Sequence, residues 1–442
     1  MSPRTDHFPV WYTSPPPMFK RLATPHLETL RDIVGPDYVL TDPESLKLAS
    51  SDETEDLSFP PEAVVRPRTP EEISRILKLA NKERIAVTPR GGGTGLSGGA
   101  LPVFGGIVLF MDRFNEIIEI DRENLFAIVE AGVITEKFQD EVEKFGLFYP
   151  PDPASRGSCF IGGNIAENSG GPRAVKYGVT KDWVYGLEVV LPTGEIIWPG
   201  GKLLKNVSGY NLTQLFVGSE GTLGVITSAT LRLIAKPRFS AVLLAAFDDP
   251  FTACRTVPAL FLAGLKPSAC EFLEKDAMEM AVRHLDKHIP NSDAPAQLLI
   301  ELDGNDEDRL AHEIESCGMI CDRSGAIDVI LAESGTRVAE IWEVRRAAGE
   351  AVKSHSIYKE EDTVVPRARL PELFVGVKKI CAGSGVRSVC YGHAGDGNLH
   401  VNLLKDTLTD REWEEKLPPT IRAIFDHCVS LGGTISGEHG IG

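Results

Sequence analysis

The chain has 442 residues, 42% of them hydrophobic and 25% charged, which predicts a soluble globular protein with two cores of unequal character. Its 46 Lys and Arg residues against 63 Asp and Glu residues give a net charge of -17, which argues against nucleic acid as a partner. No apolar stretch is long enough to span a membrane, and the eight cysteines form no C-x-x-C pair. We therefore expect neither an iron–sulfur cluster nor a zinc ribbon, but reduced thiols in a cytoplasmic protein.

The first ordered elements are expected after a loose extension at residues 1–20. That extension is rich in proline and has no apolar core, so it resembles neither a secretory signal nor a transit helix. A cap residue and a proline at 24–25 predict a short helix that ends at 35–36. A second helix is predicted to begin at 69–70, and a strand follows at 84–89.

The middle of the chain changes character twice. From Gly91 to about Ile226 it is dense in glycine, and short strands are predicted at 107–111, 126–133, 187–194 and 221–227. After Pro237 the elements are longer: strands at 241–247, 270–274 and 297–302 alternate with helices near 251–264, 275–287 and 305–316. This alternation predicts a split β-α-β sheet with helices on one face, and a domain boundary near Lys236.

The loop at 89–99 follows a predicted strand and formally matches G-x-G-x-x-G. A dinucleotide fingerprint should open a helix, yet Pro102 follows, so a Rossmann site is not favoured. Consecutive glycines can instead expose backbone N–H groups to a pyrophosphate, with Arg90, Thr94 and Ser97 adding charge and hydroxyl donors. For this loop alone, a tight structural turn is the simpler interpretation.

Two more glycine-rich loops change that balance, one from Pro150 to Gly178 and one at 217–224. Three such loops are hard to explain as turns. At these loops the sequence resembles the FAD-binding domain of the vanillyl-alcohol oxidase and p-cresol methylhydroxylase superfamily, from about residue 20 onward. The resemblance implies that the loops hold an extended FAD. Some relatives tether the flavin through a histidine in the first loop; this loop has none, so we expect non-covalent FAD, with Cys159 as an alternative tether.

Each loop is implied to hold one part of FAD. The residues expected at the pyrophosphate are Arg90, Gly91, Gly92, Gly93, Thr94, Gly95 and Ser97. Those expected at the flavin and ribityl chain are Pro151, Asp152, Gly162, Gly163, Asn164 and Asn168. Those expected on the adenine side are Glu220, Gly224, Val225 and Ile226.

A hairpin is predicted near the end of the chain. Two alternating runs flank an Asp-Gly pair at 396–397, which two-residue hairpin turns prefer. With this turn at the centre, His393 lies directly opposite His400, and their Cβ atoms are expected ~5 Å apart, close enough to share one cation. The period of two places Tyr391 and Asn402 on the same face.

The hairpin alone is equally consistent with two half-buried histidines. Glu438 and His439 follow in a glycine-rich segment of a kind that often carries functional groups. Two histidines and one carboxylate leave coordination positions open for substrate, with Zn²⁺ as the default cation and Mn²⁺ or Fe²⁺ as alternatives. A competing pair, His284 and His288, has i, i+4 spacing but no acidic third ligand nearby, so a solvated face is the simpler interpretation.

The hairpin and the segment at 438–440 resemble those of the FAD-dependent D-2-hydroxy acid dehydrogenases. That family includes D-lactate dehydrogenase, D-2-hydroxyglutarate dehydrogenase and the flavin subunit of bacterial glycolate oxidase. The resemblance implies His393, His400 and Glu438 as metal ligands, His439 as base, Asn402 as a substrate contact and Arg345 as the arginine that binds the substrate carboxylate. A surface charge on a helix is the alternative for Arg345, with Arg346 as its neighbour.

The resemblance also bears on the substrate. Hydroxyglutarate enzymes carry a lysine two residues before the aspartate of a D-x-x-x-P motif, where it holds the distal carboxylate. Here Asp362 and Pro366 form the motif, and Glu360 occupies the place of the lysine. A negative side chain there argues against a dicarboxylate and toward lactate or glycolate, unless Lys359 compensates.

We therefore expect an FAD- and divalent-metal-dependent dehydrogenase that oxidises D-lactate or glycolate to the 2-oxo acid, with His439 taking the hydroxyl proton. Without iron–sulfur ligands or a nicotinamide fingerprint, the chain needs an external acceptor: an iron–sulfur subunit, an electron-transfer flavoprotein, a cytochrome or a quinone. The alternatives are a D-2-hydroxyglutarate dehydrogenase, a non-redox flavin-dependent transferase of the ether-lipid type, and a binding subunit without catalysis. We expect the protein in the cytoplasm, or at the inner membrane face through a partner.

The expected fold is α+β. A two-part FAD-binding domain of the vanillyl-alcohol oxidase type is expected at 21–236 and a ferredoxin-like split β-α-β cap (substrate) domain at 237–430. A C-terminal segment at 431–442 is expected to return to the flavin. The chain stops at Gly442, whereas family members continue, so we expect a truncated copy or a missing tail.

Overall fold

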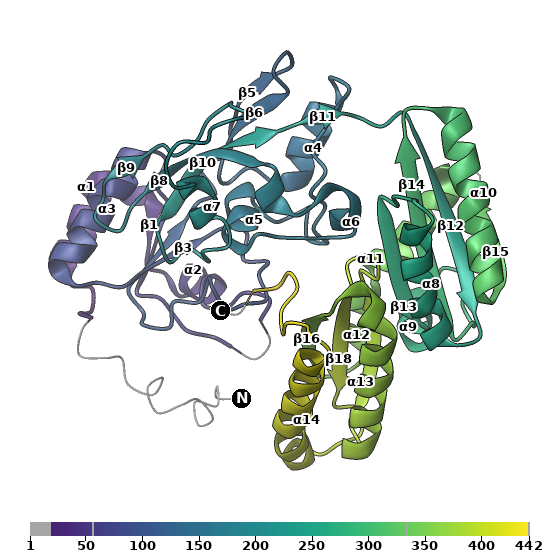
Figure 1. Ribbon diagram of the computed structural model, residues 1–442. Helices are drawn as coiled ribbons and strands as arrows, with labels where there is room; N and C mark the ends of the chain where they lie inside the picture. Colours follow the sequence, from purple (N-terminus) through teal and green to yellow (C-terminus); the bar gives the residue numbers. More distant parts are fainter. Residues whose placement is uncertain (1–18, 55–56, 333–334, 441–442) are drawn as a thin grey trace. The chain divides into compact units, whose positions relative to one another are not determined.

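The computed structural model describes residues 19–54, 57–332 and 335–440 (Figure 1). Most of the expected N-terminal extension lies outside these residues. The described chain forms two compact units. The first takes in the chain up to residue 169, residues 179–236 and the last described residues from 439, and the second takes in residues 170–178 and 237–438.

The first unit begins with a four-stranded sheet in the order β1-β2-β4-β3, in which β2, β4 and β3 are parallel. Its elements are α1 (Thr24–Val34), β1 (Val39–Leu40), α2 (Pro43–Leu48), β2 (Ala63–Val65), α3 (Pro70–Glu83), β3 (Val87–Arg90) and β4 (Ile107–Phe110). The two helices predicted here begin as expected: Pro25 and Pro70 lie in their first turns, and the Thr69 side chain accepts from the backbone N–H of Glu72. Both helices bury their apolar sides against the sheet.

The second sheet of this unit is antiparallel, in the order β5-β6-β10-β8-β9. Its strands are β5 (Ile117–Asp121), β6 (Phe126–Glu130), β8 (Val184–Val190), β9 (Ile196–Ile197) and β10 (Val225–Arg232), and β7 (Leu147–Phe148) pairs with β11 (Ile234–Ala235) apart from it. The helices around it are α4 (Thr135–Glu143), α5 (Ile161–Glu167) and α7 (Leu212–Phe216). The second glycine-rich segment was predicted as a loop, but it contains α5 and, in the second unit, α6 (Ala174–Tyr177).

The second unit is built on one seven-stranded sheet in the order β15-β12-β14-β13-β17-β18-β16. Its strands are β12 (Phe239–Phe247), β13 (Ala269–Glu274), β14 (Ala296–Gly304), β15 (Ala326–Ala332), β16 (Tyr358–Val364), β17 (Arg387–Gly392) and β18 (Asn398–Leu404). The first four strands have the order expected of a split β-α-β sheet. The pairing of β13 with β17 joins the last three strands to them, so that the hairpin lies beside the predicted core.

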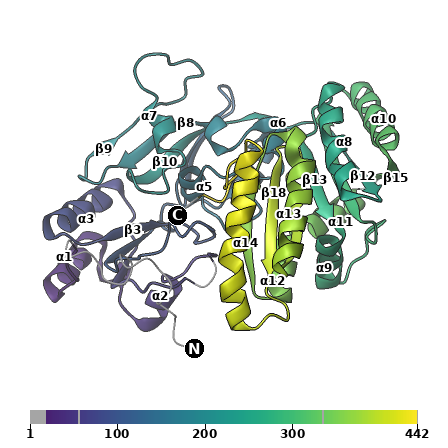
Figure 2. The ribbon, with the colours of Figure 1, turned by 60° about the horizontal axis from the view of Figure 1, so that its bottom comes forward.

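The prediction that helices cover one face of this sheet is wrong, because helices cover both. One face packs against α8 (Pro250–Leu262), α10 (Glu307–Ser324), α13 (Leu370–Ser384) and α14 (Asp410–Ser430), and the other against α9 (Lys275–Leu285), α11 (Gly335–Arg346) and α12 (Ala348–His355). Figure 2 shows α13 and α14 side by side over β18. The unbroken apolar run at 241–247 was the signal, since a strand with one wet face would alternate.

The segment after α14 returns to the sheet at β16, through bridges that pair Asp362 with Ser436 and Val364 with Thr434. This return brings Glu438 to the strand that already lies beside His400. Within the described residues, no helix is both long and apolar enough to cross a membrane.

Candidate active site

The hairpin of β17 and β18 pairs Tyr391 with His400, so the predicted register, which set His393 opposite His400, is wrong by two residues. The connection is a loop at 393–397 rather than a two-residue turn. This loop is hydrogen-bonded to β13, because the backbone N–H of Gly395 donates to Cys270 O at 2.9 Å. A shift of two residues leaves each side chain on its predicted face. His393 and His400 therefore still meet, with ring centroids 5.3 Å apart.

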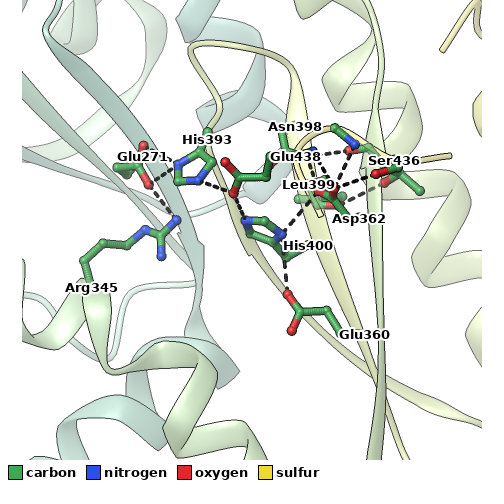
Figure 3. A network of polar contacts seen from close by, with 12 residues as sticks. Glu271, Arg345, Glu360, Asp362, His393, Asn398, Leu399, His400, Ser436 and Glu438 are labelled. Atoms are coloured by element: carbon green, nitrogen blue, oxygen red, sulfur yellow. Dashed lines mark hydrogen bonds and ion pairs between the residues drawn. The ribbon is translucent and has the colours of Figure 1, made fainter. Parts of the chain in front are cut away.

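His393, His400 and Glu438 converge on one point in the second unit (Figure 3). Oε1 of Glu438 lies 3.0 Å from Nε2 of His393 and 3.6 Å from Nε2 of His400. One nitrogen or oxygen atom from each residue lies within 4.8 Å of the others, and both histidines are buried. Two imidazole nitrogens and one carboxylate oxygen fit a catalytic divalent cation, because three protein ligands leave positions for water or substrate.

Asp362 holds the Glu438 segment in place. Its Oδ2 accepts from the backbone N–H groups of Gly437 and Glu438, both at 2.7 Å, and its Oδ1 accepts from Nδ2 of Asn398 at 2.6 Å. Oδ1 also lies 3.5 Å from Nδ1 of His400. One buried carboxylate thus anchors the backbone at Glu438 and lies beside His400. The sequence reasoning missed this because it used Asp362 only to mark a motif.

Glu271 is the second residue that sequence reasoning missed. Both of its carboxylate oxygens lie 2.9 Å from Nδ1 of His393, and Oε2 lies 2.6 Å from Nη2 of Arg345. Arg345 is buried, which excludes the alternative of a surface charge, whereas Arg346 is more exposed. A glutamate flanked on both sides by apolar residues of a strand, Cys270 and Phe272, was the signal that could have found Glu271.

The carboxylates shift the pKa values of the cluster. Burial lowers the pKa of His393, but the charges of Glu271 and Glu438 outweigh burial and raise that pKa well above its ordinary value. Burial raises the pKa of Glu438, but the two imidazoles outweigh it and bring the pKa to about 2. Burial raises the pKa of Asp396 to about 7, with His393 acting in the opposite direction. The site therefore concentrates negative charge around two imidazoles, as a cation site does.

Asn402 and Glu360 lie directly opposite each other on β18 and β16. The amide of Asn402 is fully buried, and neither of its polar atoms has a hydrogen-bond partner in the part of the chain that the structure describes. Oε1 of Glu360 lies 3.4 Å from Nδ1 of His400. An unsatisfied buried amide beside the cluster is a candidate ligand contact. The competing histidines, His284 and His288, are exposed, and α9 ends at Leu285 before it reaches the second of them.

The first and second glycine-rich loops meet in the first unit. The first leaves β3 without opening a helix. A Cβ atom on Gly92 would lie 2.5 Å from the backbone O of Ser158, and one on Gly162 would lie 2.7 Å from Cβ of Ala131. In the third loop, a Cβ atom on Gly224 would lie 2.7 Å from Cγ1 of Val189. These glycines are needed for close packing, whatever else the loops bind.

Arg90 supports an anion site at the first loop. Its Nη1 atom is buried without a hydrogen-bond partner among the described residues, and burial lowers its pKa while Asp52 acts in the opposite direction. A half-buried guanidinium with a free donor beside three consecutive glycines fits the pyrophosphate of FAD.

Other predicted flavin residues have partners within the protein. Asp152 pairs with Arg156, Nδ2 of Asn164 donates to Thr135, and Asn168 ends α5 in the left-handed conformation. Cys159 is buried against Thr135, and burial raises its thiol pKa, which disfavours the thiolate that a covalent tether would need. Glu167, which the prediction did not include, has its pKa raised to about 7 by burial and by Glu220, with His439 acting in the opposite direction.

Comparison with known protein families agrees with these two units. The model of an FAD binding domain matches residues 61–200, and that of the C-terminal domain of FAD linked oxidases matches residues 236–442. The chain is 42% identical to the glycolate oxidase subunit GlcD of Bacillus subtilis over 94% of this chain and 88% of that protein. It is 38% identical to a D-lactate dehydrogenase of Anaerostipes hadrus (86% and 82% covered) and 33% identical to a D-2-hydroxyglutarate dehydrogenase of Stutzerimonas stutzeri (94% and 90%).

Solved structures show the fold. p-Cresol methylhydroxylase has a TM-score of 0.80 at 17% identity, over 96% of this chain and 91% of that one. An alkyldihydroxyacetonephosphate synthase has a TM-score of 0.75 at 19% identity, over 94% and 81%. The family models and the relatives confirm the predicted FAD-linked oxidase family, and the solved structures confirm the α+β fold with its FAD-binding domain.

Proposed function

Because this chain belongs to the FAD-linked oxidoreductases of the D-lactate, glycolate and D-2-hydroxyglutarate family, we propose that it oxidises a short 2-hydroxy monocarboxylate, D-lactate or glycolate, to the 2-oxo acid. The observation that carries this proposal is the convergence of His393, His400 and Glu438 in a unit that also buries Arg345. Together these residues offer a cation site and a fixed positive charge, which are the two features needed to bind a 2-hydroxy acid through its hydroxyl and its carboxylate.

His393, His400 and Glu438 would hold the divalent cation, and Zn²⁺ is our first choice, with Mn²⁺ or Fe²⁺ next. Arg90 and the glycines after it would hold the pyrophosphate of FAD. A bound divalent cation supplies a Lewis acid that lowers the pKa of the substrate hydroxyl, and FAD supplies the hydride acceptor.

The protein's own side chains carry the remaining steps. Arg345 orients the substrate carboxylate through its guanidinium N–H groups, and Asn402 offers a buried amide to the substrate. A ring nitrogen of His439, which follows Glu438 directly in the chain, takes the hydroxyl proton. The sequence has neither iron–sulfur ligands nor a nicotinamide fingerprint. The electrons therefore pass to an external acceptor: an iron–sulfur subunit, an electron-transfer flavoprotein, a cytochrome or a quinone.

Glu360 favours a substrate with one carboxylate. It lies beside His400, so its negative charge would repel a second carboxylate on a ligand bound there. Lys359 is a poor compensating charge, because strand alternation directs it to the opposite face of the sheet from Glu360. Its partner on β18, Leu403, lies in the core between that face and α13 and α14. D-2-hydroxyglutarate is therefore the second candidate substrate.

Anaerobic absorbance of the flavin tests the proposal directly. The purified protein is mixed separately with D-lactate, L-lactate, glycolate and D-2-hydroxyglutarate. The metal content of the same preparation is also measured. We expect rapid bleaching by D-lactate or glycolate and about one divalent cation per chain. Bleaching by D-2-hydroxyglutarate alone would overturn the substrate assignment. No bleaching by any 2-hydroxy acid would favour a non-redox transferase.

A further inference from the structure

Glu271 lies beside the candidate cation site because its strand, β13, pairs with β17. It lies in the middle of β13, and its side chain is fully buried. β13 pairs with β17 so that Phe272 lies opposite Gly392. The same register continued by one residue puts Glu271 opposite His393. The main chain therefore sets this carboxylate beside the histidine, independently of the hairpin partner β18.

Two cationic side chains converge on the Glu271 carboxylate (Figure 3). Its oxygens lie 2.9 Å from Nδ1 of His393 and 2.6 Å from Nη2 of Arg345. A buried carboxylate is costly unless hydrogen bonds and opposite charges compensate it, and here an imidazole and a guanidinium share that task. Arg345 comes from α11 and His393 from the hairpin loop, so Glu271 ties together two elements that are far apart in the sequence.

The contact with His393 decides which ring nitrogen can bind a cation. Only an N–H group can donate to a carboxylate, so Glu271 selects the tautomer with its proton on Nδ1. Nε2, which lies 3.0 Å from Oε1 of Glu438, is then the ring nitrogen that a cation would bind in place of a proton. Histidines that bind metals are commonly oriented and made more basic by such a carboxylate.

The ion pair with Glu271 holds one nitrogen of the Arg345 guanidinium and leaves other N–H groups available as donors. Nη2 is engaged by Glu271, and Nε is buried without a hydrogen-bond partner in the described ranges. The guanidinium carbon lies 5.2 Å from the ring centroid of Tyr391, which supports the group from a second side. A planar group held at one corner keeps a donor available for a ligand carboxylate.

We propose that Glu271 is a positioning residue for both halves of substrate recognition: it orients His393 toward the cation and Arg345 toward the substrate carboxylate. This role rests on the proposed cation and carboxylate sites. It differs from a purely structural role in one respect. The effect on cation binding acts through His393, and the effect on carboxylate binding acts through Arg345, so the two effects can be separated.

The test compares Glu271→Gln with Glu301→Gln in the full chain with FAD bound. Glu301 is also buried on this face of the sheet, one strand away, but it accepts from Nε1 of Trp342 at 2.8 Å and Oγ of Ser268 at 3.2 Å. Zn²⁺ affinity is measured by competition with a chelating dye. Affinity for 2-hydroxyisobutyrate, which has no hydrogen on C2 to transfer, is measured by calorimetry at saturating Zn²⁺.

We expect Glu271→Gln to weaken Zn²⁺ binding on the order of 10–100-fold and to weaken 2-hydroxyisobutyrate binding as well, whereas Glu301→Gln leaves both unchanged. In an Arg345→Gln background, adding Glu271→Gln should still weaken Zn²⁺ binding but should no longer affect 2-hydroxyisobutyrate. Equal further losses of both affinities in that background indicate general disruption and overturn the proposal.

Unchanged affinities in Glu271→Gln also overturn it. If that variant does not fold, Glu271→Asp, which keeps the charge but shortens its reach, should show both losses in milder form, and wild-type affinities there contradict the proposal. A wild-type protein that binds no Zn²⁺ removes the cation site itself and this inference with it. Zn²⁺ binding that is indifferent to Glu271 removes only the inference.

Discussion

Among single residues, Glu360 is the side chain from which we infer a preference for D-lactate or glycolate over D-2-hydroxyglutarate. It lies on β16 opposite Asn402 and beside His400. We propose that a second substrate carboxylate would lie near it. Its effect is electrostatic and local, so a single substitution should be enough to reverse it.

Replacing Glu360 with Lys should shift the preference toward D-2-hydroxyglutarate. We expect the ratio of kcat/KM for D-2-hydroxyglutarate over D-lactate to rise at least about tenfold, which corresponds to about 1.4 kcal/mol. Glu360→Gln, which removes the charge without reversing it, should give a smaller rise in the same direction. An unchanged ratio in a lysine variant with normal metal content would show that Glu360 does not select the substrate.

His439 is the residue to which we assign the proton transfer. His439→Asn should slow flavin reduction by D-lactate roughly 10²- to 10⁴-fold, because a positioned base contributes about that much. The visible flavin spectrum should stay the same. His284→Asn, on the exposed side of α9, is the matched control and should react at the wild-type rate. Rapid reduction in His439→Asn would assign the base elsewhere.

At the scale of elements, the first and second glycine-rich loops are coupled by backbone packing in the first unit. Gly91 and Gly92 of the first loop lie against residues 158–163 of the second. Neither loop can shift without the other, because the contacts are between main-chain atoms. This coupling explains how two loops that are distant in the sequence come together.

Gly92→Ala should separate these loops and weaken FAD binding. The added Cβ would lie 2.5 Å from the backbone O of Ser158, and a carbonyl cannot move aside as a flexible side chain would. We expect a loss of at least about tenfold in FAD affinity, measured by fluorescence titration of the apoprotein. Gly318→Ala on α10, where nothing lies within 4 Å, is the control. Equal FAD affinity in both variants would contradict a flavin role for this loop.

For the whole molecule, all three candidate cation ligands lie in the second unit. A cation bound only to the folded state stabilises it by mass action, by about 2.7 kcal/mol at a hundredfold excess over Kd. The raised pKa of His393 sets the pH dependence. At lower pH this histidine keeps a proton that the cation must displace, so cation binding weakens as pH falls.

Thermal unfolding should show this linkage. Zn²⁺ should raise the Tm of the chelator-treated protein, and the rise should grow as the pH is increased from 6 to 8. Glu438→Gln should lose most of the rise, because one of the three ligands is removed. A Zn²⁺ effect of the same size in Glu438→Gln, or one that shrinks with increasing pH, would place the cation elsewhere.

The sequence alone was sufficient for the FAD-linked oxidase family, the α+β class and the candidate residues of the hairpin. These features depend on local patterns, namely glycine clusters, alternation and cap residues, which one segment can express without its neighbours. The same local patterns account for the helices that begin at Thr24 and Pro70.

The tertiary structure decided what depends on pairing between distant strands. β13 holds the hairpin loop in place, so the register is two residues from the predicted one, yet His393 and His400 remain together because side chains repeat every two residues. Glu271 and Asp362 contact the cluster from strands that precede the hairpin by many residues. Their roles are set by proximity in space, which no local pattern in the sequence records.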